Sequence, residues 1–277
     1  MNGIVIVNKP AGYTSRDVVN KLSKIFNTKK IGHTGTLDPI AQGVLVVVIG
    51  KYTKLCEDLT QTYKEYIATF KLGILTDTLD ITGKVLDELS VLVSEEEVKK
   101  VIKSFICEYD QEVPFYSSVK INGKKLYEYA RNNENIELPK RKVDIKNIEI
   151  LDINKESVKI KCLVSKGTYI RSLIRDIGES LKTHATMTEL IRTKQGIFDI
   201  KESSTLEDIE KGNYKLINPE TCLDVCILQV GELDKEITNG VKQKMNIPNK
   251  YILFKKNDDN IALYKKEFDY FKMYIKF

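Results

Sequence analysis

The sequence lacks the features that mark membrane and secreted proteins. No apolar run approaches the roughly 18 residues of a membrane-spanning helix, and the longest, Val44–Ile49, has the length of a strand. The apolar stretch near the N-terminus is too short for a signal peptide and has no basic residues before it. The five cysteines form no C-x-x-C pair, and their odd number and scattered positions are typical of reduced thiols. We therefore expect a cytoplasmic protein without a membrane segment.

Motifs for cofactors are also missing. Only two histidines occur, His33 and His184, which argues against a zinc site built from His and Cys. The glycine-rich loops that bind nucleotides, G-x-x-x-x-G-K-[ST] and G-x-G-x-x-G, are absent. We therefore expect no metal and no nucleotide cofactor.

The chain does have the length for a large core. With 277 residues, 42% of them apolar, it can bury about three quarters of its unfolded surface without disulfides or metals. Its net charge of +5 permits an anionic partner but is far from that of a polycation. The length fits one large domain or two unequal ones.

Hydrophobic spacing predicts helices and strands without a regular strand–helix–strand order. Helices are expected after a cap at Ser15, after a capping box at Ser94 and Glu97, after Gly167, and at 205–210. Strands are expected at 4–7, 44–49, 63–72, 143–153 and 158–164, with a turn at 154–156 and a loop at 31–43. We therefore predict an α+β fold with a mixed, mostly antiparallel central sheet and flanking helices.

A change of pattern near residue 223 predicts a domain boundary. Gly212 and Pro219 follow the last expected helix, and short strand-like pieces then occur at 226–230, 251–254, 261–264 and 269–276. We predict a main domain at residues 1–222 and a small β module at 223–277.

The strongest candidate for chemistry is an aperiodic loop, GHTGTLDPIAQG at 32–43. It concentrates glycines, polar residues and the carboxylate of Asp38 before a buried strand, and loops held by rigid strands commonly carry catalytic groups. Ordinary turn chemistry explains the same residues, because Asp-Pro and Gly-Thr are common in turns and Asp38 can cap its own loop.

The segment GTYIR at 167–171 opens a helix, whose free N–H groups attract anions. Arg171 is also the kind of neighbour that keeps a reactive carboxylate ionised. Alternatively, Arg171 and Arg175 are surface residues of an amphipathic helix.

Two further segments carry weaker signals. Asp77 and Asp80 suit a paired-acid catalyst or a magnesium site, but turns stabilised by their side chains explain the same residues more simply. The segment 119–146 has eight basic and four acidic residues with Tyr127 and Tyr129 among them, which suits either RNA or a solvated face.

Several motifs nevertheless follow one another in a characteristic order. They are NKPAGYTS at 8–15, GHTGTLDPIAQGVL at 32–45, KEY at 64–66, TDTLDITG at 76–83, the segment 114–131, SKGTYIR at 165–171 and LIRT at 190–193. Together they resemble the motifs of the TruB-type tRNA pseudouridine synthases, over about residues 3–200.

The resemblance implies that the protein isomerises uridine 55 in the T-arm of tRNA to pseudouridine, without cofactor or metal, after flipping the base. It implies that Asp38 is the catalytic carboxylate, acting on the base or the sugar, that Tyr66 stacks on the flipped base, and that Arg171 pairs with Asp38. It gives substrate-binding roles to His33, which fills the stack left by the nucleotide, to Leu190, which lines the pocket, and to Gly32, Thr34, Lys9 and Lys64.

The same resemblance implies that residues 223–277 form an abbreviated PUA-like RNA-binding module and that the protein is a monomer without an obligate protein partner. Two other interpretations stay open. One is a tRNA-binding folding helper whose catalysis is dispensable or lost. The other is a box H/ACA-type synthase, which needs protein partners and a guide RNA and is disfavoured by the short tail.

Overall fold

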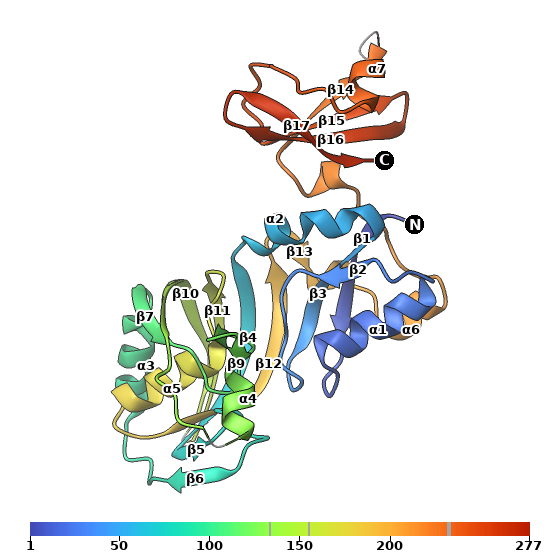
Figure 1. Cartoon of the computed structure of the whole chain (residues 1–277). Coiled ribbons are helices and arrows are strands. Elements are labelled where there is room, and N and C mark those ends of the chain that lie inside the picture. Colours follow the sequence, from blue (N-terminus) through green and yellow to red (C-terminus); the bar gives the residue numbers. More distant parts are fainter. Residues whose placement is uncertain (133, 155, 232–233) are drawn as a thin grey trace.

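The computed structural model describes residues 1–132, 134–154, 156–231 and 234–277, and contains a large central sheet and a smaller C-terminal sheet (Figure 1). Central strands follow the order β1 (Gly3–Lys9), β3 (Gln42–Ile49), β12 (Ala185–Gln195), β4 (Lys64–Leu72), β11 (Ser157–Val164), β10 (Lys140–Ile153) and β7 (Glu108–Glu112). At its side, β2 (Ile31–His33) pairs with β3 and β13 (Phe198–Asp199) with β12. All these pairs are antiparallel except β12 with β3, which confirms the predicted α+β fold.

Helices cover one face of the central sheet. They are α1 (Ser15–Ile25), α3 (Glu95–Ser104), α5 (Ile170–Ser180) and α6 (Leu206–Glu210), and their apolar side chains share one core with the strands. Shorter elements are η1 (Gly50–Leu55), α2 (Cys56–Thr60), α4 (Leu126–Arg131), η2 (Ile200–Glu202), η3 (Pro219–Thr221) and the hairpins β5 (Ile74–Thr76) with β6 (Val85–Glu88) and β8 (Lys120–Ile121) with β9 (Lys124–Lys125). In the described ranges, no helix combines the length and the apolar character needed to cross a bilayer.

Through η1 and α2, the C-terminal sheet shares a core with the other face of β1 and β3 (Figure 1). It has the order β14 (Val225–Gln229), β15 (Tyr251–Lys256), β16 (Asp259–Glu267) and β17 (Tyr270–Lys276), with α7 (Asp234–Thr238) beside it. Side chains alternate along β3, so that Val47 faces the helices while Val46 shares a core with Leu253 and Leu263. The strand is therefore buried on both faces, as its continuous apolar run predicts.

Asp58 links α2 to the C-terminal sheet. Its carboxylate, whose side chain is 8% exposed, accepts hydrogen bonds from Lys250 Nζ at 2.9 Å, Lys265 Nζ at 3.0 Å and Tyr274 OH at 3.2 Å. Burial alone raises the pKa of this carboxyl, but its hydrogen-bond donors outweigh burial and lower the pKa to about 2. The C-terminal sheet, which lies beside α2 in Figure 1, is thus held there by an ionised group.

The structure corrects two expectations. The cap of α1 is Thr14 and not Ser15, because Thr14 and Asp17 exchange hydrogen bonds in a capping box while the Ser15 hydroxyl turns to the backbone of Leu37. Residues 31–43 are not all loop, since Ile31–His33 pairs with β3 and is too short to show a period. Lys155, within the expected turn at 154–156, lies outside the described residues.

Gly43 allows β12 to approach β3. The two strands meet at Ile191 with Gln42 and at Arg192 with Gly43. Gly43 has a φ of +98°, and a Cβ at this position would lie 2.3 Å from the backbone oxygen of Arg192. Both the dihedral angle and the available space therefore require glycine.

We expect Gly43→Ala to lower the free energy of unfolding by more than about 3 kcal/mol, because a backbone clash adds to the cost of the left-handed conformation. Gly123→Ala is the matched control, since Gly123 has a φ of +81° but no atom within 4 Å of its added Cβ. The free energy of unfolding of Gly123→Ala should fall by only about 1 kcal/mol. Urea unfolding followed by circular dichroism measures both, and equal losses would contradict the close approach.

Candidate active site

A cavity of about 400 Å³ lies where the loop after β2 meets the start of α5. Its volume falls in the range typical of small-ligand sites, about 300–1,000 Å³. Its lining includes the side chains of Asp38, Lys64, Tyr66, Arg171, Leu190 and Arg192. Five of the predicted site residues are thus brought together: Asp38, Lys64, Tyr66, Arg171 and Leu190.

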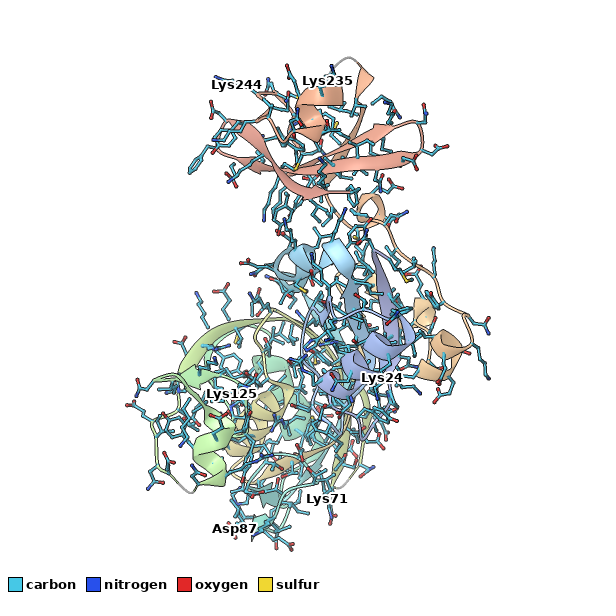
Figure 2. The ribbon with its side chains drawn as sticks, turned by 45° about the vertical axis from the view of Figure 1, so that its right-hand side comes forward. Lys24, Lys71, Asp87, Lys125, Lys235 and Lys244 are labelled. Carbon is cyan, nitrogen blue, oxygen red and sulfur yellow. The ribbon has the colours of Figure 1, made fainter. Side chains whose placement is uncertain are left out.

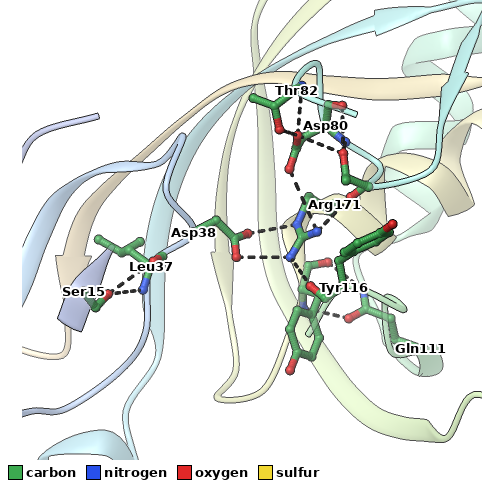
Figure 3. A network of polar contacts seen from close by, with 10 residues as sticks. Ser15, Leu37, Asp38, Asp80, Thr82, Gln111, Tyr116 and Arg171 are labelled. Atoms are coloured by element: carbon green, nitrogen blue, oxygen red, sulfur yellow. Dashed lines mark hydrogen bonds and ion pairs between the residues drawn. The ribbon is translucent and has the colours of Figure 1, made fainter. Parts of the chain in front are cut away.

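Asp38 and Arg171 form a bidentate ion pair at the cavity (Figure 3). Arg171 Nε donates to Asp38 Oδ2 at 2.9 Å, and Arg171 Nη2 donates to Asp38 Oδ1 at 3.1 Å. The arginine side chain is 4% exposed and the aspartate side chain 31% exposed. Both side chains line the cavity, and the carboxylate is the more accessible of the two.

Backbone carbonyls fix the rest of the Arg171 guanidinium. Nη1 donates to the carbonyl of Thr78 at 2.8 Å, and Nη2 donates to that of Tyr116 at 3.1 Å. A second carboxylate, that of Asp80, lies 3.9 Å from Nη1. Because a buried cation is costly without partners, these contacts determine where the guanidinium can sit.

The segment 76–83 forms a tight turn rather than a converging acid pair. Asp80 Oδ1 accepts from the hydroxyls of Thr78 and Thr82 and from the Thr82 amide, while Asp77 Oδ1 accepts from the Lys84 amide at 2.8 Å. Leu79 between them has a φ of +62°, a strained conformation for this residue type. No three His, Cys, Asp or Glu side chains gather in the described part of the chain as metal ligands do.

Buried cations also hold the loop that carries Asp38. Arg192, 1% exposed, donates to the carbonyls of Val44 at 2.7 Å and Gly35 at 3.1 Å. Lys9 is fully buried and its Nζ donates to the carbonyls of Pro10, Tyr13 and Pro39, the last directly after Asp38. On the far side of the loop, Ser15 exchanges hydrogen bonds with the backbone of Leu37.

The predicted residues Gly32, His33, Thr34 and Lys9 lie behind the cavity or beside it and do not line it. Thr34 is buried, and its oxygens accept hydrogen bonds from the Gln195 side chain. Gly32 and His33 belong to β2, which pairs with β3. Burial, with Arg192 and Arg16 nearby, lowers the pKa of His33, so the imidazole is neutral at pH 7.

Burial also shifts the pKa values of two groups that face the cavity. It raises the pKa of the Tyr66 phenol, which therefore stays protonated. Burial, together with the nearby charges of Arg192 and Lys166, lowers the pKa of Lys64 to about 8. Positive charge thus surrounds the cavity, although part of it is lost above pH 8.

The basic stretch 119–146 contributes one wall of the cavity through Tyr127. Lys125 Nζ lies 5.3 Å and the Arg131 guanidinium 5.4 Å from the centre of the Tyr127 ring. The Lys124 ammonium lies over Tyr129 at 4.4 Å. These cation–π contacts place aromatic and basic groups together at the rim, an arrangement that suits nucleic acid.

Some side chains of the site were not expected from the sequence. Tyr116 and Lys166 line the cavity, and Gln195 supports the loop before Asp38. Arg192 shares the inward alternation of Leu190 along β12, which is the signal that would have identified it as buried. Gln195 lies beyond a β-bulge between Arg192 and Lys194, so simple alternation does not reach it.

Comparison with known proteins places the chain among pseudouridylate synthases. Residues 23–170 match the family model of the TruB family pseudouridylate synthase N-terminal domain, and residues 171–233 match that of the tRNA pseudouridylate synthase B C-terminal domain. The curated tRNA pseudouridine synthase B of Clostridium tetani is 44% identical over 271 residues, which are 96% of this chain and 93% of that protein. The protein of the same name from Clostridium novyi is 50% identical over 256 residues, 90% of this chain and 88% of that protein.

A solved structure supports the family assignment. The crystal structure of a Cbf5-Nop10-Gar1 complex matches with a TM-score of 0.70 at 25% identity, over 99% of this chain and 84% of the matched chain. The fold and the sequence matches define the class as a pseudouridine synthase, which is an isomerase. The chain belongs to the TruB family of pseudouridylate synthases.

The lowered pKa of Lys64 predicts a pH dependence of stability. Between pH 8 and 10.5 the unfolded chain holds a proton on this lysine that the folded chain has lost, so its contribution to stability rises with pH. The free energy of unfolding of wild type should therefore rise by about 1–2 kcal/mol more than that of Lys64→Met when the pH is raised from 8 to 9.5. Urea unfolding at both pH values measures this change. Lys159→Met, at an exposed lysine on β11, is the control and should show no such trend.

Proposed function

We propose that this protein isomerises uridine 55 in the T-arm of tRNA to pseudouridine, with Asp38 as the catalytic carboxylate. The observation that carries the proposal is the ion pair of Asp38 and Arg171 at the cavity of a TruB family chain. In this reaction the bond between ribose carbon 1′ and uracil nitrogen 1 breaks. The base turns, carbon 5 bonds to carbon 1′ and loses its proton to solvent, and nitrogen 1 takes up a proton, so that the product is an isomer of uridine.

The geometry supports a distinct role for each group. Asp38 presents its carboxylate to the cavity and acts on the base or the sugar. Arg171 holds that carboxylate in one orientation, so that little reorganisation is needed when the substrate arrives. The protonated phenol of Tyr66 offers a ring face for the flipped uracil, and Leu190 packs against the base.

Other groups bind the RNA around the cavity. A flipped nucleotide leaves a gap in its stack, and the neutral imidazole of His33 in β2 is suited to fill it beside the Gly32 backbone. Lys64 supplies positive charge for phosphate. Lys9 and Thr34 do not line the cavity, and they contribute by holding the loop that positions Asp38.

We further propose that the chain divides into a catalytic domain at 1–222 and an abbreviated PUA-like RNA-binding module at 223–277. The separate C-terminal sheet, which begins with β14, supports this division. The protein acts as a monomer in the cytoplasm, where tRNA matures, and needs no protein partner.

Asp38→Asn should reduce tritium release from tRNA transcribed with [5-³H]uridine by about 10²–10⁴-fold, because the amide cannot replace a carboxylate that reacts. Affinity for the tRNA should stay within about threefold of wild type. Asp152→Asn, at an exposed carboxylate in β10, is the control.

The same assay separates the alternatives. A transcript with cytidine at position 55 should release nothing, and release from it would reject the proposed site. Wild-type protein that binds tRNA and releases no tritium would indicate a folding helper. Release only after addition of partner proteins and a guide RNA would indicate a box H/ACA-type enzyme.

Because phosphate contacts dominate RNA binding, affinity for a T-arm stem-loop should fall about tenfold or more between 50 and 200 mM NaCl. Lys125→Gln should flatten the plot of log K against log salt by about one unit, because Lys125 lies beside Tyr127 at the cavity rim. Lys71→Gln, at the opposite end of β4 from Lys64, should leave the slope unchanged (Figure 2). Affinity that does not change with salt would refute the phosphate contacts.

A further inference from the structure

The first turn of α5 carries Arg171, yet the local sequence does not fix where this helix starts. The N-cap residue is Tyr169, which makes no capping hydrogen bond with its side chain. Serine, threonine, aspartate and asparagine are the residues that cap well at this position. Just before it, the Thr168 hydroxyl donates to the Ser165 carbonyl at 2.9 Å and closes a turn, but this turn supplies no hydrogen bond to Tyr169. The contacts that hold Tyr169 must therefore come from elsewhere.

Gln111 in β7 supplies such contacts (Figure 3). Its Oε1 accepts a hydrogen bond from the Tyr169 amide at 2.8 Å, and its Nε2 donates to the Tyr169 carbonyl at 3.1 Å. The same carbonyl accepts the first helical hydrogen bond, from the Leu173 amide at 3.0 Å. One side-chain amide, on a residue that is 1% exposed, thus binds both backbone polar groups of the residue that begins the helix.

Other contacts from β7 hold later parts of α5. The Ser172 hydroxyl donates to the carbonyl of Glu112 at 2.8 Å, and Arg175 Nη1 donates to the Glu112 carboxylate at 2.9 Å. The Tyr109 hydroxyl donates to Asp176 at 3.1 Å and accepts from Gln111 Nε2 at 2.7 Å. Among these side chains of β7, Gln111 is the one that binds the backbone ahead of Arg171.

We propose that Gln111 is a positioning residue for the isomerisation, an inference that rests on the proposed function. By fixing the Tyr169 peptide, it sets the place from which the Arg171 guanidinium meets Asp38. Arg171 follows two residues later, about 3 Å along the helix axis, so a shift of the helix start moves the guanidinium by a similar amount. A bidentate pair tolerates little displacement. Gln111 does not line the cavity, so its effect on the reaction passes through α5.

The test compares Gln111→Met with Tyr109→Phe, using tritium release to obtain kcat and KM. Both variants remove buried hydrogen bonds at the contact of β7 with α5, but only Gln111→Met frees the Tyr169 peptide. A displacement near 1 Å can cost about 10²-fold in rate. We expect kcat of Gln111→Met to fall about 10–100-fold with KM within about threefold of wild type, and kcat of Tyr109→Phe to stay within about twofold. Unfolding midpoints ensure that both are assayed as folded protein.

Equal kcat for wild type and Gln111→Met would overturn the proposal. So would equal losses in both variants, or a loss confined to KM, since these indicate a general structural role. If Gln111→Met does not fold, Gln111→Glu decides. It keeps the shape and an acceptor for the Tyr169 amide but, when ionised, has no donor for the carbonyl. A kcat that falls below wild type as pH rises and this carboxyl ionises, at unchanged KM, supports the proposal, and a kcat equal to wild type at every pH overturns it.

The wild type separates this inference from the proposed function. If wild-type protein releases no tritium, the proposed function fails. If wild type and Gln111→Met release it equally, only the role of Gln111 fails.

Discussion

The site depends on the placement of one buried guanidinium, that of Arg171. Its ion pair with Asp38 is possible only if the loop after β2, the turn at 76–83, the segment around Tyr116 and the start of α5 all reach the same point. A buried charge that lost one of these partners would cost several kcal/mol, so partly assembled versions of the site are disfavoured. The site is therefore assembled together with the fold rather than added to it.

Buried cations have a common task in this structure. Lys9, Arg171 and Arg192 all donate to backbone carbonyls of irregular segments, those of Pro10, Thr78 and Gly35 respectively. Such carbonyls have no strand or helix partner, and a carbonyl buried without a donor is unfavourable. A long cationic side chain supplies several donors and binds loop segments far apart in sequence. In this way the protein keeps the loop that carries Asp38 irregular and still holds it in one conformation.

Much of the fold could be predicted from local patterns. Alternation along β4, the capping box of α3, and the turn at Asn122 and Gly123, both with positive φ, follow from neighbouring residues alone. The site could be predicted only from the resemblance of the motifs to those of a known family, because Asp38 and Arg171 are 133 positions apart and no spacing rule links them. Gln111 gave no signal, since a glutamine in a strand usually faces solvent. Its contact with Tyr169 depends on how β7 and α5 pack.

The double burial of β1 and β3 has a consequence for biosynthesis. Ile4, Ile6, Val44 and Val46 share a core with Tyr251 and Leu253, which leave the ribosome about 200 residues later. At roughly 5–20 residues per second, this face of the nascent chain lacks that cover for about 10–40 s. A stop codon after Arg192 and before Tyr251 would make this loss of cover permanent. Truncated products of this gene should thus be chaperone clients and protease substrates even when every residue of the cavity has been translated.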